Sequence, residues 1–392
     1  MIFFFYIYNM KNIKEKIEAS IMLSSYLETI GYKNGSWEFN YMIETNTLPD
    51  NSIMWITLLH HYMILGGNDI DITGFNSSDD TILIIATAEA VSKDGGIKNY
   101  IKEYLDSYEL LNDGKRQTGL STLKSLKELK RGIRIKEESS MGGNGAAMRT
   151  GPIGLLWYKD YEKVIEESII ASCITHNYYL GFLGGMVTAL FTSFAMKNIV
   201  PYKWVEELLE LYKNKIIHKY YPKDHNIDDL NVYMNYWKRY QETRINKLKH
   251  KNALKSFIFP EDRTEFLLGY FPDPKIQALV LKGESLKKIN FPFNKIGSSG
   301  IDSCIYAYDC LLMSMYTPDT NTIDLDNIAF NFNTFMTLVT VHPGDNDTTA
   351  AIGGTWYGAY MGFEGFNNYD KLKKLEFYKE LKKVSDKIIR LL

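Results

Sequence analysis

Two short acidic clusters near opposite ends of the chain contain the residue types that bind a hard divalent cation. Residues 78–81 read Ser-Asp-Asp-Thr and residues 344–348 read Gly-Asp-Asn-Asp-Thr, which together supply four carboxylates and two or three hydroxyls. Oxygen donors of this kind are the ligands that Mg²⁺ and Mn²⁺ prefer. Each cluster stands where a loop is expected to enter a helix, and backbone N–H groups also point outward there. If the fold brings the clusters together, they form one metal centre.

Each cluster also has a purely structural interpretation. Ser78 followed by Asp79 and Asp80 is an ordinary helix start, because an N-cap serine and acids in the first turn complement the helix dipole. The second cluster is harder to explain in this way, since Asp345 and Asp347 lead into a run of small residues whose helix must pack closely against another element. It does not match an EF-hand loop, which needs a glutamate at its twelfth position. On the residues alone, both interpretations stay open.

Three further segments could contact a ligand. Residues 142–149 are rich in glycine, which allows left-handed backbone and close approach of N–H groups to a pyrophosphate, or simply a tight turn. They are not a dinucleotide fingerprint, because no strand precedes them and the glycine spacing differs. His176 stands just before a glycine-rich helix, as a ligand contact or as a structural histidine. Residues 297–302 place hydroxyls at a helix start, where capping is the alternative.

The elements that must position these residues are helices. Apolar residues recur at a spacing of three and four, whereas convincing alternation typical of strands is absent. No linker or fixed-period repeat divides the chain, so we expect one compact all-α domain with long functional loops. The predicted helices are residues 13–30, 81–91, 97–111, 161–175, 204–217, 230–248, 301–315, 328–341 and 369–392.

Two uncharged segments resemble membrane signals in part. Residues 1–8 are apolar, but they lack a basic region and a small-residue cleavage site and are too short to span a bilayer. We expect residues 1–10 to be a disordered or artefactual extension, with translation starting at Met10 and a single domain at residues 11–392. Residues 177–196 approach spanning length but carry small residues on several faces, which favours a central, closely packed helix.

The overall composition excludes some classes of partner. The 392 residues carry 45 basic and 47 acidic side chains, a formal charge of −2, so neither a nucleic acid nor an anionic membrane is an expected partner. The three cysteines, Cys173, Cys304 and Cys310, form no CxxC pair and no even disulfide framework. This pattern favours buried thiols and a reducing compartment, and we expect a cytoplasmic protein.

In their order along the chain, these segments resemble the ADP-ribosylglycohydrolase family. The resemblance covers nearly the whole chain and is closest to the arginine-specific branch, ADP-ribosylarginine hydrolase, because of the Gly-Tyr-x-Asn-Gly-x-Trp-Glu-Phe segment at residues 31–39. The other matching stretches are residues 78–81, 86–90, 145–149, 175–176, 181–184, 189–192, 297–300, 307–309 and 344–352.

The resemblance implies a compact orthogonal helical domain with a dinuclear site for two Mg²⁺ ions, Mn²⁺ being the other cation that this oxygen set accepts. It implies an enzyme that hydrolyses the N-glycosidic bond between ADP-ribose and arginine on mono-ADP-ribosylated proteins, releases ADP-ribose and acts as a monomer. By position in the motifs, the implied metal ligands are Ser78, Asp79, Asp80, Asp345, Asp347 and Thr348. The implied substrate contacts are Ser121, Gly142, Thr175, His176, Ser299, Gly300 and Asn346.

The implied mechanism uses three carboxylates. Two cations would bind the ribose hydroxyls and lower the pKa of a bound water, which attacks the anomeric carbon through an oxocarbenium-like transition state. Asp79 or Asp80 would orient or deprotonate this water, and Glu38 would lie beside the substrate and assist the leaving guanidinium.

Two alternatives and one departure accompany this interpretation. The enzyme could instead cleave O-linked ADP-ribosylserine, or the chain could be an inactive relative that only binds ADP-ribose. The departure is at Leu27 and Glu28, where the family usually has Gly-Asp. Glu28 keeps a carboxylate on a chain one methylene longer, while Leu27 would push its helix away from the metal loop if the two backbones touched at that point.

Overall fold

The computed structural model describes residues 2–40, 51–246, 296–317, 322–323 and 330–392. Within these residues the regular secondary structure is helical, as the sequence predicts, apart from one antiparallel pair of two-residue strands, β1 (Tyr316–Thr317) and β2 (Thr322–Ile323), and two isolated β-bridges. The helices are α1 (Ile2–Tyr32), α2 (Asn51–Ile64), α3 (Asp79–Val91), α4 (Gly96–Asp106), α5 (Tyr108–Leu111), α6 (Leu120–Leu129), α7 (Gly151–Leu156), α8 (Tyr161–Cys173), α9 (Tyr179–Met196), α10 (Trp204–Lys213), α11 (Ile216–Tyr220), α12 (Ile227–Tyr240), α16 (Asp302–Met313), α17 (Phe332–Thr340), α18 (Asn346–Met361), α19 (Tyr369–Leu372) and α20 (Tyr378–Leu391).

Some predicted helices are divided in the structure. The predicted segment 204–217 forms α10 and α11, because Lys215 between them adopts a left-handed conformation with φ of 59°. Residues 97–111 likewise form α4 and α5, and residues 369–392 form α19 and α20. No glycine or proline marks these breaks, so the apolar spacing continues across them and gives no warning. The ends of two predicted helices, residues 247–248 and 328–329, lie outside the described residues.

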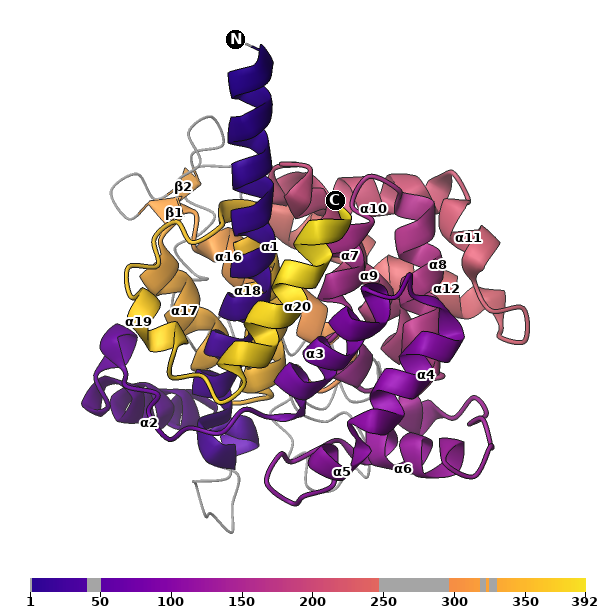
Figure 1. Ribbon diagram of the computed structural model, residues 1–392, viewed down its shortest axis with the longest axis horizontal. Coiled ribbons are helices and arrows are strands. Elements are labelled where there is room, and N and C mark those ends of the chain that lie inside the picture. Colours follow the sequence, from indigo (N-terminus) through magenta and orange to yellow (C-terminus); the bar gives the residue numbers. More distant parts are fainter. Residues whose placement is uncertain (1, 41–50, 247–295, 318–321, 324–329) are drawn as a thin grey trace.

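Helix α1 packs along α18, which lies in the C-terminal part of the chain (Figure 1). The contact is close enough to bring side chains of one helix onto backbone of the other: Ser24 Oγ donates to the Ala351 carbonyl at 2.7 Å, and Ser20 Oγ donates to the Thr355 carbonyl at 2.8 Å. A Cβ atom on Gly354 would lie 2.6 Å from the Leu23 carbonyl oxygen. The small residues at the start of α18 are therefore explained by its packing on α1.

The departure at Leu27 does not separate these helices. Leu27 is fully buried within the hydrophobic core, and glycines on either side of it along the contact allow the two backbones to approach closely. One of them, Gly31, would bring a Cβ atom to 2.5 Å from the Asn346 carbonyl oxygen. Close contact between α1 and the second acidic cluster is thus made one turn beyond Leu27.

The centre of the molecule is α9, which lies among α7, α8, α16 and α18. Among the described residues, α9 has the length and composition to cross a membrane, but all of its residues are buried inside the protein. This confirms the prediction of a closely packed central helix. Phe191 on α9 contacts the rings of Trp204, Trp237 and Trp356 in the core.

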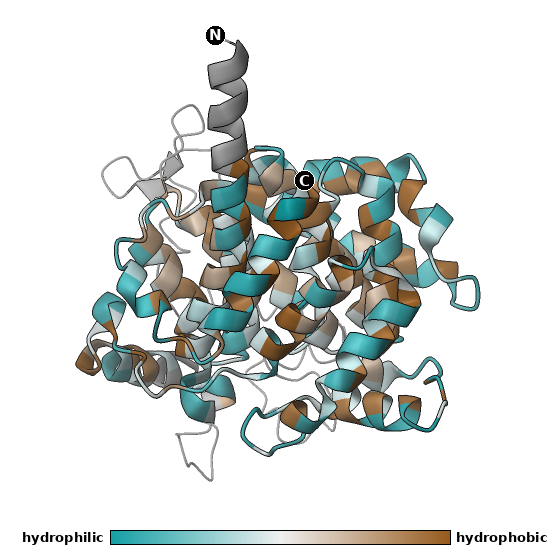
Figure 2. Ribbon diagram, viewed as in Figure 1, coloured by the Kyte–Doolittle hydropathy of each residue, from teal (hydrophilic) through white to brown (hydrophobic). Residues whose placement is uncertain are grey.

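The outer helices carry the polar residues. In Figure 2 the exposed faces of α4 and α20 are largely hydrophilic, consistent with their position over α3 and α1 at the surface. Helix α1 begins at Ile2 and its first turns project beyond the other helices in Figure 1. Cys304 and Cys310 are fully buried, and Cys173 is partly buried.

Candidate active site

The two acidic clusters lie at the N-termini of two helices that meet at α1. Ser78 is the N-cap of α3, and its Oγ accepts the backbone N–H of Asp80 at 3.2 Å. Asp345 is the N-cap of α18, and its side chain accepts the N–H of Thr348 at 3.4 Å. The capping interpretation is therefore correct for both clusters. It does not replace the metal interpretation, because the two capped ends converge.

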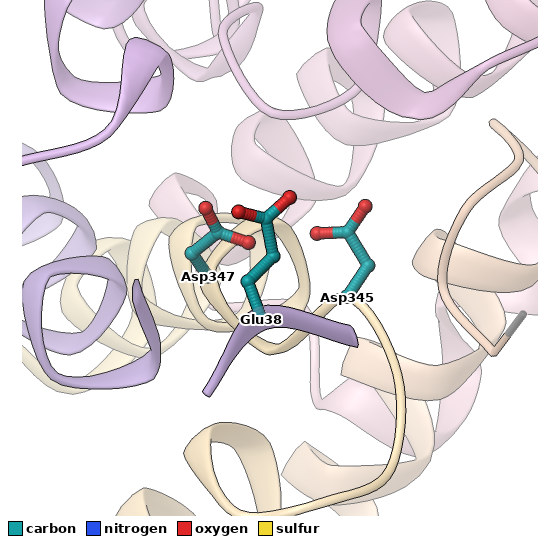
Figure 3. A group of neighbouring side chains, drawn as sticks. All are labelled: Glu38, Asp345 and Asp347. Atoms are coloured by element: carbon teal, nitrogen blue, oxygen red, sulfur yellow. The ribbon is translucent and has the colours of Figure 1, made fainter. Parts of the chain in front are cut away.

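Three carboxylates mark the point of convergence. Glu38, Asp345 and Asp347 each offer an oxygen within 4.8 Å of the other two, and all three side chains are buried. In Figure 3 the Glu38 carboxylate lies between the two aspartates, and the three groups point to the same side. The backbone N–H of the next residue, Phe39, donates to the Gly344 carbonyl at 2.8 Å, which fixes this segment on the second cluster.

The first cluster faces the second directly. Thr348 Oγ1 lies 3.4 Å from Asp80 Oδ1, and the hydroxyl of Ser78 interacts with Asp347. Asp79 borders the same cavity as Asp345 and Asp347. The structure thus brings together all six residues that the sequence assigned as metal ligands.

The carboxylates of the two clusters repel one another, and burial adds to the cost of their negative charge. Burial, followed by repulsion from Asp347, raises the pKa of Asp79 to about 7. The same two causes, in the same order, raise the pKa of Asp80 and of Asp345 well above the ordinary value for aspartate. Burial also raises the pKa of Asp347. Carboxylates that repel one another in a water-poor site are stabilised by a bound cation.

The donor set fits a divalent metal. Asp80 Oδ2 is enclosed and has no hydrogen-bond partner within the described residues, which leaves a buried acceptor available to a cation. The remaining donors are carboxylate and hydroxyl oxygens, with no thiol or imidazole among the assigned ligands, as hard cations such as Mg²⁺ prefer. Glu38 adds a carboxylate that the sequence had assigned to the substrate side and not to the metal.

A further acidic residue, Glu28, supports the first cluster from α1. Its Oε2 accepts the backbone N–H and the hydroxyl of Ser78 at 3.3 Å, and its Oε1 accepts a hydrogen bond from Thr81. Burial raises the pKa of Glu28 to about 8, against the hydrogen bond from Thr81 that lowers it. The carboxylate retained at the Leu27-Glu28 departure therefore orients the Ser78 turn.

A cavity of about 700 Å³ opens above the carboxylates. Of the predicted substrate contacts, Ser121 and His176 line it, and Glu38 lines it as well. The other lining residues from the sequence motifs are Phe39, Asp79, Gly143, Asn144, Gly145, Met148, Ser298, Asp345, Asp347 and Thr348. The lining residues outside these motifs are Gln117, Thr118, Gly119, Leu120, Thr122 and Ser140.

Three predicted contacts lie behind the cavity wall. The Gly300 N–H donates to the Gly142 carbonyl at 3.1 Å, and residues 143 and 299 form an isolated antiparallel bridge. Ser299 is held by Asp302, which accepts its backbone N–H at 2.8 Å and also its hydroxyl. These contacts fix the shape of the wall. The N-cap residue of α16 is Ile301, whose side chain makes no capping hydrogen bond, while the Asp302 N–H donates to Ser299 Oγ at 3.3 Å.

Two other predicted contacts have their side chains turned inward. Thr175 is fully buried and bonds to Arg149 and His176. The Asn346 amide donates to the Thr340 and His342 carbonyls, each at 3.2 Å, which ties the start of α18 to the end of α17. These bonds hold the Asn346 side chain against the end of α17, and it does not line the cavity.

The glycine-rich loop differs from expectation in its backbone. Gly142 and Gly143 have φ of −86° and −64°, so they are not left-handed. Glycine is needed here for close approach: a Cβ atom on Gly145 would lie 2.6 Å from His176 Cε1. Between the glycines, Asn144 Nδ2 donates to Asp345 Oδ2 at 2.8 Å and to the Gly297 carbonyl at 2.6 Å. Asn144 had no assigned role, although its place in the glycine run was a usable signal.

Comparisons with known proteins agree with this geometry. The sequence pattern of the ADP-ribosylglycohydrolase family matches residues 35–392. The chain is 31% identical to ADP-ribosylhydrolase ARH1 of Dictyostelium discoideum, over 92% of this chain and 91% of that protein. It is 30% identical to a protein of Acanthamoeba polyphaga mimivirus named as an ADP-ribosyl glycohydrolase, L444, over 86% of this chain and 62% of the viral protein.

A solved structure shares the fold. A chain from an ADP-ribosylglycohydrolase-related protein complex superposes with a TM-score of 0.52 at 15% identity, covering 96% of this chain and 99% of the other. The match of the family pattern over most of the chain, together with the converging acidic clusters, confirms the general prediction of an ADP-ribosyl hydrolase, whereas the arginine linkage stays a prediction. The chain belongs to the ADP-ribosylglycohydrolase family.

Proposed function

We propose that this protein removes ADP-ribose from arginine side chains of mono-ADP-ribosylated proteins by hydrolysing the N-glycosidic bond. The observation that carries the proposal is the convergence of Asp79, Asp80, Asp345 and Asp347 at one end of a 700 Å³ cavity. A cavity of this size is within the range that holds a nucleotide-sized ligand. The Trp37-Glu38-Phe39 segment, which resembles the arginine-specific branch, lies at the same cavity through Glu38 and Phe39.

Divalent cations, when bound by these carboxylates, would fix the ribose hydroxyls and make a water more acidic. The residues that would hold them are Ser78, Asp79, Asp80, Asp345, Asp347 and Thr348, joined by Glu38. The oxygen-only donor set suits Mg²⁺ or Mn²⁺.

Protein groups handle the proton and the leaving group. Asp79 borders the cavity, and the Gly119 N–H lies 3.4 Å from its Oδ2, so this side chain is held where it can orient or deprotonate a water. When water attacks the anomeric carbon, the C–N bond breaks and the water proton passes to the carboxylate and then to the departing guanidine. The Glu38 carboxylate, buried beside Asp345 and Asp347, attracts the cationic arginine side chain.

The test compares two linkages. Purified protein with Mg²⁺ is incubated with matched peptides that carry ADP-ribose on arginine or on serine, and free ADP-ribose is measured. We expect release from arginine at a rate at least about tenfold higher than from serine. Preferential release from serine would replace the arginine proposal with the O-linked alternative.

The inactive alternative requires a separate readout. If neither peptide is cleaved while ADP-ribose still raises the melting temperature, the protein binds without catalysis. The retained oxygen donors at all six ligand positions favour turnover over this outcome.

A further inference from the structure

We propose that Arg149 and Thr175 fix the proton of His176 on Nε2, so that His176 serves as a hydrogen-bond donor to an oxygen of ADP-ribose in the cavity. The identity of the ligand rests on the proposed function, whereas the position of the proton follows from the contacts of the protein itself. Arg149 and Thr175 are positioning residues in this proposal, because neither lines the cavity.

The arrangement begins with a buried guanidinium. Arg149 is fully buried, and its hydrogen bonds go to neutral groups: Nη1 donates to the Gly145 carbonyl at 2.7 Å, and Nη2 donates to the Ala171 carbonyl at 3.2 Å and to Thr175 Oγ1 at 2.7 Å. Its Nε donates to the Tyr104 hydroxyl at 3.2 Å, and its Cζ lies 4.6 Å from the centroid of the same ring. A guanidinium has only donors, so Thr175 Oγ1 must be the acceptor in this pair.

The hydroxyl hydrogen of Thr175 then needs an acceptor. Its other partner is His176 Nδ1 at 2.8 Å, and no further partner is present within the described residues. If Nδ1 carried the proton, the Oγ1 hydrogen would be buried without an acceptor, which is unfavourable. If Nδ1 is unprotonated, it accepts this hydrogen and both groups are satisfied. The proton of the neutral imidazole therefore lies on Nε2.

The imidazole is held in place by contact with glycines. A Cβ atom on Gly145 would lie 2.8 Å from Nε2, and one on Gly181 would lie 2.9 Å from His176 Cβ. Side chains at either position would displace the ring. His176 lines the cavity, and its Nε2 has no hydrogen-bond partner within the described residues. Nε2 is therefore the atom available to a ligand.

The nearby guanidinium also keeps the ring uncharged. Burial, and then the positive charge of Arg149, lowers the pKa of His176 well below its ordinary value. A neutral donor suits a site whose carboxylates would hold cations, because it adds no further positive charge.

The test uses ¹⁵N NMR of the histidine rings in the full-length protein without ligand, with His176 assigned from its loss in His176→Asn. We expect the wild-type ring to show its proton on Nε2 at neutral pH. Thr175→Val, which keeps the shape and removes the hydroxyl, is expected to yield a mixture of tautomers, whereas Thr175→Ser restores the Nε2–H form. A wild-type proton on Nδ1, or a Thr175→Val spectrum equal to that of wild type, would overturn the inference.

The second arm measures ADP-ribose binding by calorimetry with Mg²⁺ present. Gln places an amide N–H near the position of Nε2 and Asn near that of Nδ1, so His176→Asn should weaken binding by about tenfold. His176→Gln should retain most of it. Equal loss in both variants overturns the donor role. If the wild-type protein binds no ADP-ribose, the proposed function fails, and the tautomer spectrum still decides the inference about Arg149 and Thr175.

Discussion

Arg116 and Glu376 form a two-point ion pair, with Nη1 to Oε2 at 2.6 Å and Nη2 to Oε1 at 2.7 Å. The pair encloses the backbone of Ser77, whose N–H donates to Glu376 at 3.0 Å and whose carbonyl accepts from Arg116 at 2.8 Å. Ser77 directly precedes the first acidic cluster, and Arg116 directly precedes the loop that lines the cavity. The segment between α19 and α20 therefore holds two parts of the site in place.

The first prediction concerns this ion pair. Glu376→Gln replaces an acceptor oxygen with a donor, so we expect the free energy of unfolding to fall by about 1–3 kcal/mol and turnover to decrease, because the Ser77 turn loosens. Chemical denaturation and a hydrolysis assay measure both. Asp370→Asn removes the exposed pair between Asp370 and Lys373 and is the matched control, with an expected change below about 0.5 kcal/mol. Equal losses of stability and turnover in the two variants would contradict the proposed role of the Arg116–Glu376 pair in holding Ser77.

The second prediction concerns the carboxylates. We expect Asp79→Asn and Asp347→Asn to abolish turnover while the helical circular dichroism spectrum remains. Without metal, Asp347→Asn should melt at a higher temperature than wild type, since it removes a charge that repels Asp79 and Asp80. Addition of Mg²⁺ should stabilise wild type more than either variant. Unchanged activity in either variant would refute the metal-centre assignment.

The third prediction is a pH dependence of stability. The folded pKa of Asp79 is about 7, above the value of about 3.9 for an unfolded aspartate. Between these values the folded state binds more protons, so the stability of the metal-free protein falls as pH rises from about 4 to about 7. Because cations compete with protons for the same oxygens, Mg²⁺ should raise the melting temperature more at pH 7.5 than at pH 5.5. A stabilisation by Mg²⁺ that does not vary with pH would count against this account.

The fourth prediction concerns the contact of α1 with the second cluster. Gly31→Ala would place Cβ 2.5 Å from the Asn346 carbonyl oxygen, and backbone atoms cannot move away by changing rotamer. We expect a loss of about 1–3 kcal/mol in the free energy of unfolding and weaker Mg²⁺ binding. Gly119→Ala is the control for stability, since its Cβ meets nothing within 4 Å. A Gly31→Ala variant as stable as Gly119→Ala would mean that α18 shifts without cost.

Much of the fold could be predicted because the spacing of apolar residues marks the helices directly. The acidic clusters were also visible, since Ser78 and Asp345 are recognisable N-caps with acids beside them. Their convergence was not visible from spacing, because it depends on two helices packing against α1. It was inferred only from the order of motifs along the chain.

Other parts of the site were beyond the sequence. Successive residues at the start of a helix point in different directions, so Asn346 faces the end of α17 while Asp345 and Asp347 on either side face the cavity. Glu28 could be noted as a departure but not as a hydrogen-bond partner of Ser78, since that requires the crossing of α1 and α3. Arg149 could be quoted within a motif, but its contact with Thr175 depends on how α7 and α8 meet.

The packing of α18 on α1 also sets when the site can form during synthesis. The first cluster emerges from the ribosome with α3, while its partners at α18 follow more than 260 residues later. Until then, the chain lacks Asp345 and Asp347, and the face of α1 that binds α18 has no partner. We expect nascent chains that end before residue 345 to bind Mg²⁺ no better than isolated acidic peptides, so that catalytic competence is one of the last properties the chain acquires.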